Sequence, residues 1–141
     1  EENAELNKQI EEGKRERIRS IVESIEPTLT EEDGIVLIAR QADFLPDIVK
    51  GIAFGLKPKF PNLVFVIGSA VGGKPALTVM LGDEIVSRGV DASKVVREAA
   101  KEISGGGGGQ PFYATAGGKD VAGIEKAIFR AVELIKTQLK R

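Results

Sequence analysis

Apolar residues recur at helical spacing near both ends of this 141-residue chain. In residues 2–26 they alternate with charged residues at approximately helical intervals, which predicts a long N-terminal helix that ends at Pro27. In residues 121–139 the period is close to 3.6, which predicts a C-terminal helix capped by Asp120. The apolar positions are Leu6, Ile10, Ile18, Ile21, Val22 and Ile25 in the first helix, and Val121, Ile124, Ile128, Ala131, Ile135 and Leu139 in the last.

Apolar runs between these two helices predict strands. GIVLIAR (34–40), NLVFVIGSA (62–70) and ALTVML (76–81) are typical of buried strands, and FYATA (112–116) predicts a short fourth one. Two glycines before Lys74 favour a hairpin turn between the second and third strands. A short helical piece is predicted around 83–88. Two further helices are predicted, one capped by Asp43 with Phe44, Leu45, Ile48, Val49, Ile52 and Leu56 inward, and one capped by Asp91 with Val95, Val96, Ala99, Ala100 and Ile103 inward.

The order of these elements predicts an α/β fold, with a small mixed sheet, helices packed on it and a long N-terminal helix in front. We divide the chain into a helical arm at 1–33 and a globular domain at 34–141. The arm helix would span about 37 Å, which is longer than one side of such a domain can shield. The N-terminal half of this helix therefore either stays in solvent or meets a second copy, and a weak homodimer through the arm is the simplest closed arrangement. The chain begins inside a helical pattern and without methionine, so we interpret it as a piece of a longer protein.

The composition excludes several kinds of site. The chain has no cysteine and no histidine, which removes disulfides, thiolate metal sites and nucleophiles activated by histidine. No apolar run approaches the roughly 20 residues of a membrane span, and no secretory signal is visible. An enzyme built from carboxylates, lysine or tyrosine stays open at this point. We expect a cytoplasmic chain without a metal, a cofactor or a membrane partner.

Charge is distributed unevenly although the net charge is -1. Residues 1–33 carry 11 acidic and 5 basic side chains, whereas the remaining residues carry 10 acidic and 15 basic ones. A basic globular part next to an acidic arm suggests a polyanionic partner for the globular part.

GSAVGGK at 68–74 matches the G-x-x-x-x-G-K portion of a phosphate-binding P-loop. A P-loop continues with Ser or Thr and a helix, whereas this chain continues with Pro75 and a predicted strand. We interpret the stretch as a hairpin turn, with Lys74 as an exposed cation in reach of a phosphate. The acidic residues at 31–33 and 83–84 lie at turns or helix starts, where carboxylates stabilise the backbone.

SGGGGGQPFYATAGGK at 104–119 raises the question of a linker or an ordered loop. Only 22 residues follow Lys119, enough for one helix that must return to the same core. Ordering a run of glycines costs backbone entropy, so we expect a loop whose backbone approaches a partner closely or needs positive φ angles. Its N–H groups then suit phosphate or base edges. A disordered loop is the alternative.

GGGGGQPFYATAGGKDVAGIEKAI resembles the closing motif of the C-terminal domain of alanyl-tRNA synthetases, which is similar to the DHH-associated domain of single-strand exonucleases and phosphoesterases. The resemblance covers about residues 34–140, and residues 1–26 resemble the helical segment in front of that domain. Two positions depart from the family pattern: Gln110 replaces the usual arginine, and Phe112-Tyr113 replace a common Asp-Met pair. The matching residues are Gly105 to Gly109, Pro111, Ala114, Ala116, Gly117 and Gly118.

The resemblance implies a non-catalytic domain that binds the outer corner of an alanine-specific tRNA and oligomerises, while other domains of the parent ligase carry aminoacylation and editing. The aromatic pair either stacks on bases or lies in the core. A single-strand-binding domain of a DHH-type exonuclease or phosphoesterase and a pure oligomerisation module are the alternatives. The expected nucleic-acid contacts are Gly105, Gly106, Gly107, Gly108, Gly109, Gln110, Phe112, Tyr113, Lys119, Lys74 and Arg88.

Overall fold

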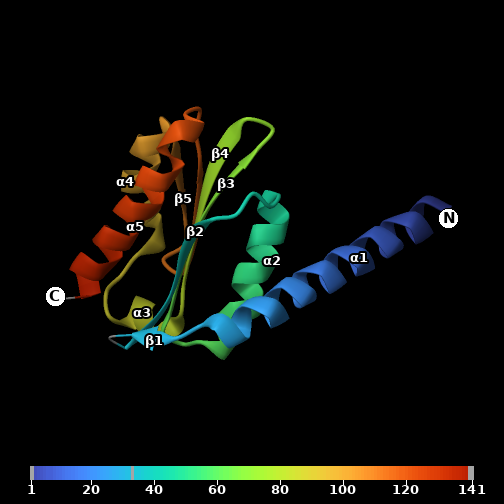
Figure 1. The fold of residues 1–141 in the computed structure, drawn as a ribbon, viewed down its shortest axis with the longest axis horizontal. Helices are drawn as coiled ribbons and strands as arrows, with labels where there is room; N and C mark the ends of the chain where they lie inside the picture. The colour runs from blue at the N-terminus through green and yellow to red at the C-terminus, as the bar shows by residue number, and fades with distance from the viewer. Residues whose placement is uncertain (1, 33, 140–141) are drawn as a thin grey trace.

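A six-stranded mixed sheet forms the centre of the molecule (Figure 1). The computed structural model describes residues 2–32 and 34–139, with side-chain packing described from residue 13 onward except at 33, 46, 140 and 141. The strand order is β1-β2-β3-β4-β6-β5. The strands are β1 (Glu31–Glu32), β2 (Ile35–Gln41), β3 (Leu63–Val71), β4 (Lys74–Leu81), β5 (Gly106–Gly109) and β6 (Tyr113–Gly117).

The helices cover both faces of this sheet. The only parallel pair among these strands, β2 and β3, is joined by a helical crossover, and the other pairs are antiparallel. The predicted α/β class, mixed sheet and long N-terminal helix are confirmed. The helices are α1 (Glu2–Ile25), α2 (Pro46–Leu56), α3 (Asp83–Ser87), α4 (Ala92–Ala99) and α5 (Ile124–Leu139), with short 3₁₀ segments η1 (Glu26–Thr28), η2 (Lys57–Lys59), η3 (Ala100–Ile103) and η4 (Val121–Gly123).

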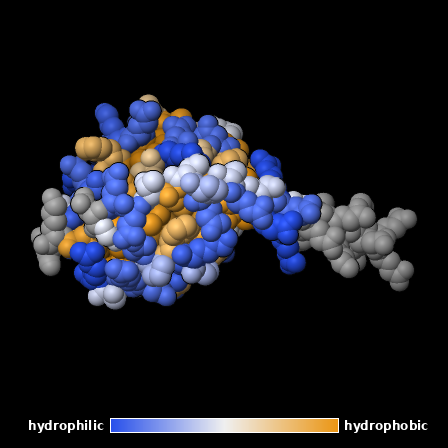
Figure 2. All heavy atoms as spheres, turned by 60° about the horizontal axis from the view of Figure 1, so that its bottom comes forward, coloured by the Kyte–Doolittle hydropathy of each residue, from blue (hydrophilic) through white to orange (hydrophobic). Residues whose placement is uncertain are grey.

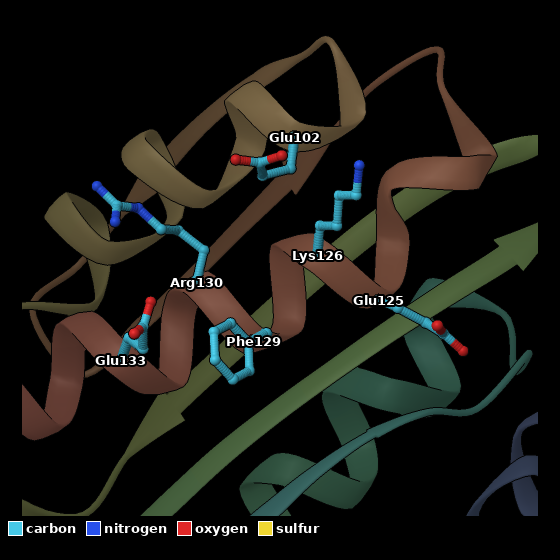
Figure 3. A pocket seen from close by; sticks show the side chains of 6 residues that line it. All are labelled: Glu102, Glu125, Lys126, Phe129, Arg130 and Glu133. Carbon is cyan, nitrogen blue, oxygen red and sulfur yellow. The ribbon is translucent and has the colours of Figure 1, made fainter.

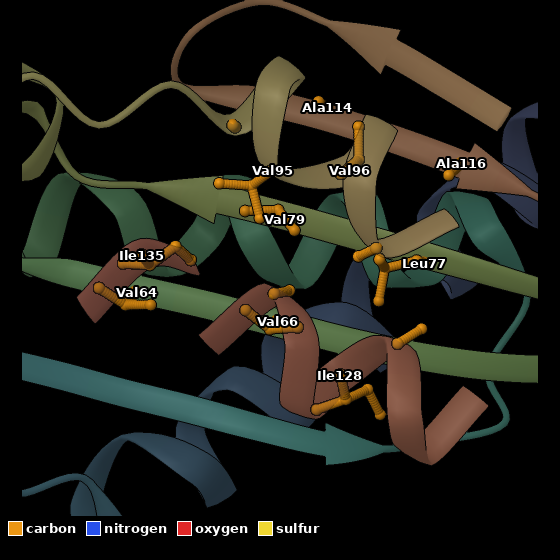
Figure 4. Packing of buried hydrophobic residues seen from close by; sticks show 14 of the residues in the cluster. Val64, Val66, Leu77, Val79, Val95, Val96, Ala114, Ala116, Ile128 and Ile135 are labelled. Atoms are coloured by element: carbon orange, nitrogen blue, oxygen red, sulfur yellow. The ribbon is translucent and has the colours of Figure 1, made fainter. Parts of the chain in front are cut away.

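The core is divided into two layers by the sheet. Helices α4 and α5 lie on one face, while α2 and the end of α1 lie on the other (Figure 1). Alternate residues of each central strand therefore point into different layers. Figure 4 shows the first layer, in which strand residues Val64, Val66, Leu77 and Val79 pack against Val95, Val96, Ile128 and Ile135.

The C-terminal half of α1 is fixed to the body through two glycines of α2. A Cβ atom at Gly51 would overlap the side chain of Ile18, and one at Gly55 would lie 3.1 Å from Val22 Cγ2. Glycines four residues apart thus form a shallow groove that receives two residues of α1, also four apart. Val22 and Ile25 are buried there, whereas α1 extends beyond the body toward the N-terminus (Figure 1).

The acidic arm adds ion pairs to this contact. Lys14 Nζ lies 2.6 Å from Asp47 Oδ2 of α2, and Lys59 Nζ lies 2.9 Å from Glu26 Oε2. Hydrophilic side chains cover most of the face in Figure 2, with apolar patches between them.

The sheet begins inside the predicted arm, because β1 (Glu31–Glu32) pairs with β2. The division of the chain into an arm and a globular domain at residue 33 stays a prediction.

Two of the three predicted aspartate caps are confirmed. Asp91 accepts a hydrogen bond from Ser93 N, and Asp120 accepts one from Ala122 N at the 3₁₀ turn that leads into α5. The prediction for Asp43 is wrong: Leu45 is the N-cap of α2. The Asp43 carboxylate instead accepts from Gln41 Nε2 and from the backbone N–H of Ala70 in the neighbouring strand β3, and these bonds lower its pKa.

The β3–β4 connection is the predicted hairpin turn. Gly72 and Gly73 have φ angles of 63° and 74°, the left-handed pair that a two-residue hairpin loop requires. Strand β4 begins at once with Lys74. A strand and not a helix therefore follows this turn directly, and the P-loop interpretation is excluded. Two predicted inward residues, Leu45 and Val121, are instead exposed.

Candidate nucleic-acid interface

The glycine run is an edge strand and not a loop. Gly106 to Gly109 form β5, which pairs antiparallel with β6 from Gly106 opposite Gly117 to Gly109 opposite Ala114. The predicted glycine-rich loop is therefore wrong, because the backbone is ordered by a ladder that needs no side chains. The expectation of a close backbone approach is confirmed, with the neighbouring strand as the partner.

Alternate glycines of this segment lie against β6. A Cβ at Gly105 would overlap Gly117 O, one at Gly107 would overlap Thr115 O, and one at Gly109 would lie 2.6 Å from Tyr113 O. Backbone atoms cannot move aside as a flexible side chain can. These glycines are therefore required by packing in the folded domain, whatever ligand it binds.

The two intervening glycines have room for a side chain. A Cβ at Gly106 would meet no atom within 4 Å, and one at Gly108 would lie 3.7 Å from Arg97 and Ser93 of α4.

The hydrogen-bonding pattern shows which backbone groups of β5 are open to a ligand. Gln110 and Tyr113 exchange two hydrogen bonds of 2.8 and 3.3 Å. Because bonded residues alternate along an antiparallel ladder, the N–H and C=O groups of Gly107 point to the open edge.

The turn after β5 presents the two aromatic residues. Gln110 is exposed, while Phe112 and Tyr113 are half-buried. Lys57 Nζ lies 5.1 Å from the centroid of the Phe112 ring, and the Tyr113 ring lies 5.1 Å from that of Phe54 at an angle of 59°. Each ring thus packs partly on the protein and remains partly accessible, and stacking on bases stays a prediction.

Helix α2 supplies functional candidates that the sequence alone did not reveal. Lys50, Phe54 and Lys57 are spaced i, i+4 and i+7 on the helix side next to the aromatic turn. Phe54 is 40% exposed, and Lys50 Nζ lies 6.0 Å from its ring. We call Lys50, Phe54, Lys57, Phe112 and Tyr113 the basic–aromatic face. The available signal was Phe54, which falls outside the apolar stripe predicted for this helix.

A groove of about 370 Å³ lies beside the basic–aromatic face. The Asp47 carboxylate at its rim is held by Lys14, whose hydrogen bond lowers the pKa of Asp47. The Lys50 ammonium therefore stands next to an already paired carboxylate. The lining residues are Asp47, Lys50, Ala76, Thr78, Tyr113, Thr115, Ala116 and Gly117.

The predicted cations do not form one cluster. Lys74 and Lys119 lie at one end of the sheet, where Gly118 N–H donates to Pro75 O at 3.1 Å. Arg88 follows α3, beyond the opposite end of β4. The glycine strand runs between these two ends, so the sequence-predicted contacts extend along a sheet edge.

A second hollow, of about 440 Å³, lies between η3 and α5 (Figure 3). Its acidic and basic side chains point in different directions and surround Phe129, which is 65% exposed. The hollow is lined by Glu102, Glu125, Lys126, Phe129, Arg130 and Glu133.

Within the described residues, no group of three His, Cys, Asp or Glu side chains is placed to hold a metal ion. No described helix combines the length and apolarity needed to span a membrane.

Burial raises the pKa of the Tyr113 phenol above its ordinary value of 10.0. Because the folded state disfavours the phenolate, this contribution to stability is complete below pH 10 and is lost as the pH rises through the folded-state pKa. Tyr113 is the only tyrosine and the chain has no tryptophan, so tyrosinate absorbance reports on this residue alone. We expect the titration in native buffer to lie at higher pH than the titration in denaturant; coincident curves would show that the ring is not desolvated.

A DHHA1 domain model matches residues 33–141 of this chain. An alanine–tRNA ligase of Bacteroides thetaiotaomicron is 47% identical over 135 residues, which cover 95% of this chain and 16% of the relative. An alanine–tRNA ligase of Cytophaga hutchinsonii is 42% identical over 139 residues, covering 96% of this chain and 16% of the relative. The chain therefore spans about a sixth of the length of these relatives.

Two solved structures share the fold. The C-Ala domain from Aquifex aeolicus alanyl-tRNA synthetase matches with a TM-score of 0.62 at 28% identity, covering 80% of this chain and 98% of that one. The DHH domain of a member of a ribosomal protein family matches with a TM-score of 0.55 at 17% identity, covering 89% and 31%, which shows the shared fold alone. The chain belongs to the DHHA1 domain family and matches the C-terminal region of alanine–tRNA ligases, where the C-Ala domain is found.

Proposed function

We propose that this chain is the tRNA-binding domain at the C-terminus of an alanine–tRNA ligase and that it holds the outer corner of the tRNA. The observation that carries the proposal is the 47% identity to an alanine–tRNA ligase over 135 residues, nearly the whole chain. Aminoacylation and editing would belong to other domains of the parent protein, in the cytoplasm. With no histidine or cysteine in its sequence, this domain offers neither the usual general base nor thiolate ligands.

The basic–aromatic face supports RNA as the ligand. The Lys50 ammonium neutralises phosphates, and so does that of Lys57 once a phosphate replaces its partner Asp83, whose Oδ1 lies 2.9 Å from Lys57 Nζ at the surface. The partly exposed rings of Phe54 and Tyr113 offer stacking surfaces to unpaired bases. Folded RNA is recognised through such unpaired bases together with phosphate and sugar contacts. The outer corner of a tRNA, built from loops, presents both kinds of group.

We expect the chain to bind folded tRNA more tightly than an unstructured RNA of equal length. The reason is that a rigid face selects phosphates and bases that are already held in place. Fluorescence polarisation with labelled tRNA, competed by either unlabelled RNA, measures the difference. Equal or tighter binding of the unstructured strand would favour a single-strand-binding domain of the exonuclease type.

We also expect affinity to decrease steeply with salt. If about four phosphates are neutralised, log K against log salt should have a slope of about -3 to -4. A slope near zero would contradict a binding mode led by basic side chains.

Phe54→Leu, which keeps an apolar side chain but removes the stacking ring, should weaken tRNA binding without changing the salt slope.

We further propose that the N-terminal half of α1 meets a second copy of the chain. The body of the molecule covers the C-terminal half of this helix, where Val22 and Ile25 are buried, and α1 continues beyond the body (Figure 1). A two-fold pairing of these extensions is the simplest closed arrangement. The acidic excess of the arm makes the expected association weak.

A further inference from the structure

We propose that a basic stripe on α4 and η3, formed by Lys94, Arg97 and Lys101, is a second RNA-binding surface that takes the sugar–phosphate backbone. It lies on the opposite face of the sheet from the basic–aromatic face, with the edge strand β5 between them. The inference rests on the proposed function, since it assigns a further part of the same RNA to a separate surface.

Charge is segregated around this helix. The residues facing the core are apolar or small, and the outward positions are charged. At 100° per residue, Arg97, Lys101 and Lys94 occupy one side of the outward arc, beginning next to β5. Glu98 and Glu102 occupy the other side, toward α5, where Glu102 lines the hollow of Figure 3. The helix thus presents a positive edge to the glycine strand.

Arg97 connects the stripe to the edge strand. Its Nε and Nη2 atoms lie 3.7 Å from the position that a Cβ of Gly108 would occupy. With no side chain there, the guanidinium lies directly against the strand backbone. The N–H groups of Gly107 and Gly109, which alternate along the ladder with residues that bond to β6, point outward and add further donors to the same edge. A guanidinium beside free backbone N–H groups suits a phosphate oxygen pair.

The cations of the stripe are available for a ligand. In the part of the chain that the structure describes, Arg97 and Lys94 are exposed and have no carboxylate within salt-bridge distance. Lys101 Nζ lies 3.3 Å from Glu98 Oε2, with both side chains largely in solvent. Such surface pairs contribute little and are readily exchanged for a phosphate.

Two cations predicted from the sequence extend the stripe at its ends. The backbone N–H of Lys119 donates a hydrogen bond of 2.8 Å to the carbonyl oxygen of Ile103, the last residue of η3. Arg88 shares a hollow of about 270 Å³ with Lys94 at the start of α4. Arg88 Nη2 also donates to Leu139 O at 3.4 Å. Lys119 and Arg88 add positive charge near both ends of the stripe.

The chemistry of the stripe favours phosphate over bases. Residues 92–103 contain no aromatic side chain, so bases find no stacking surface there. Lysine and arginine side chains bind backbone phosphates in any sequence context. We therefore assign base stacking to the basic–aromatic face and backbone contact to the stripe on α4.

The test compares two variants of the 141-residue chain that lose the same charge. Lys94→Gln with Arg97→Gln alters the stripe, and Lys126→Gln with Arg130→Gln alters exposed positions of α5. We expect the first variant to bind tRNA more weakly and to reduce the magnitude of the salt slope by about 1.4 to 1.8. The second should keep the wild-type slope. Thermal unfolding of both variants verifies the fold.

A variant that is expected to gain affinity gives an independent test. Glu98→Lys adds a cation to the stripe and frees Lys101, so tRNA affinity should increase and the slope should steepen by about 1 or more. Equal losses in the two double variants, or no loss in the first while the wild type binds, would overturn the stripe and leave the tRNA-binding function in place. A wild-type chain that binds no tRNA would overturn both.

Discussion

Replacing Gly107 with valine will destabilise the folded domain, whereas the same replacement at Gly106 will be nearly neutral. A Cβ at Gly107 would overlap Thr115 O and lie 2.5 Å from Ala116 Cα. Both atoms belong to the backbone of β6, which is fixed between β5 and β4. The clash can be relieved only by separating the strands, so we expect a loss of about 2–4 kcal/mol in the free energy of unfolding.

Gly106 provides the matched control one residue away. Its added Cβ would meet no atom within 4 Å, and its φ angle is not positive. Valine there restricts the unfolded chain and favours the extended backbone. Urea unfolding of the two variants should therefore differ by at least about 2 kcal/mol. Equal stabilities would mean that β5 does not lie against β6 as described.

The sequence alone suggested a different outcome at Gly107. If the glycines formed a ligand-binding loop, valine would weaken RNA binding more than folding. The structure assigns the odd-numbered glycines to strand packing, so folding is affected first. The stable Gly106→Val variant is the better probe of the ligand, and reduced tRNA affinity in this variant would place RNA at the β5 edge.

The main elements of the fold could be predicted because apolar side chains mark them. The strands at 63–71 and 74–81 carry buried residues that leave a clear pattern, and so does α5. Strand β5 consists of glycines and β1 of two exposed glutamates, so neither has an apolar pattern. Both lie at the sheet edges, where pairing of the backbone defines a strand without burial.

The candidate site was harder to predict because it joins distant segments. Lys50 and Lys57 look like ordinary solvent-facing residues of an amphipathic helix. They form a candidate site only together with Phe112 and Tyr113, which the sheet brings next to this helix. The sequence pattern identified the aromatic pair and several cations, but a strand order with β6 next to β4 cannot be read from local periodicity.

The second large effect concerns how much of the arm belongs to the domain. A chain that begins at Thr28 loses Val22 and Ile25, both buried between α1 and the sheet, as well as the contact of Ile18 with Gly51. At about 1.5–3 kcal/mol for each buried side chain, we expect a loss of roughly 3–6 kcal/mol. A chain that begins at Gly13 keeps all these contacts and should unfold at nearly the same urea concentration as the full chain.

A comparison of the full chain with the chain that begins at Gly13 separates folding from self-association. In analytical ultracentrifugation the full chain should show a weak, concentration-dependent dimer, while the chain beginning at Gly13 should remain monomeric, because it keeps the folded domain and lacks the extension of α1. A monomer at every concentration in both chains would contradict pairing through the arm. A dimer in both would place the interface on the body, and the chain beginning at Thr28 cannot make this distinction because its core is incomplete. The Gly13 chain should also keep the tRNA affinity of the full chain per binding site, since neither the basic–aromatic face nor the α4 stripe includes a residue before it.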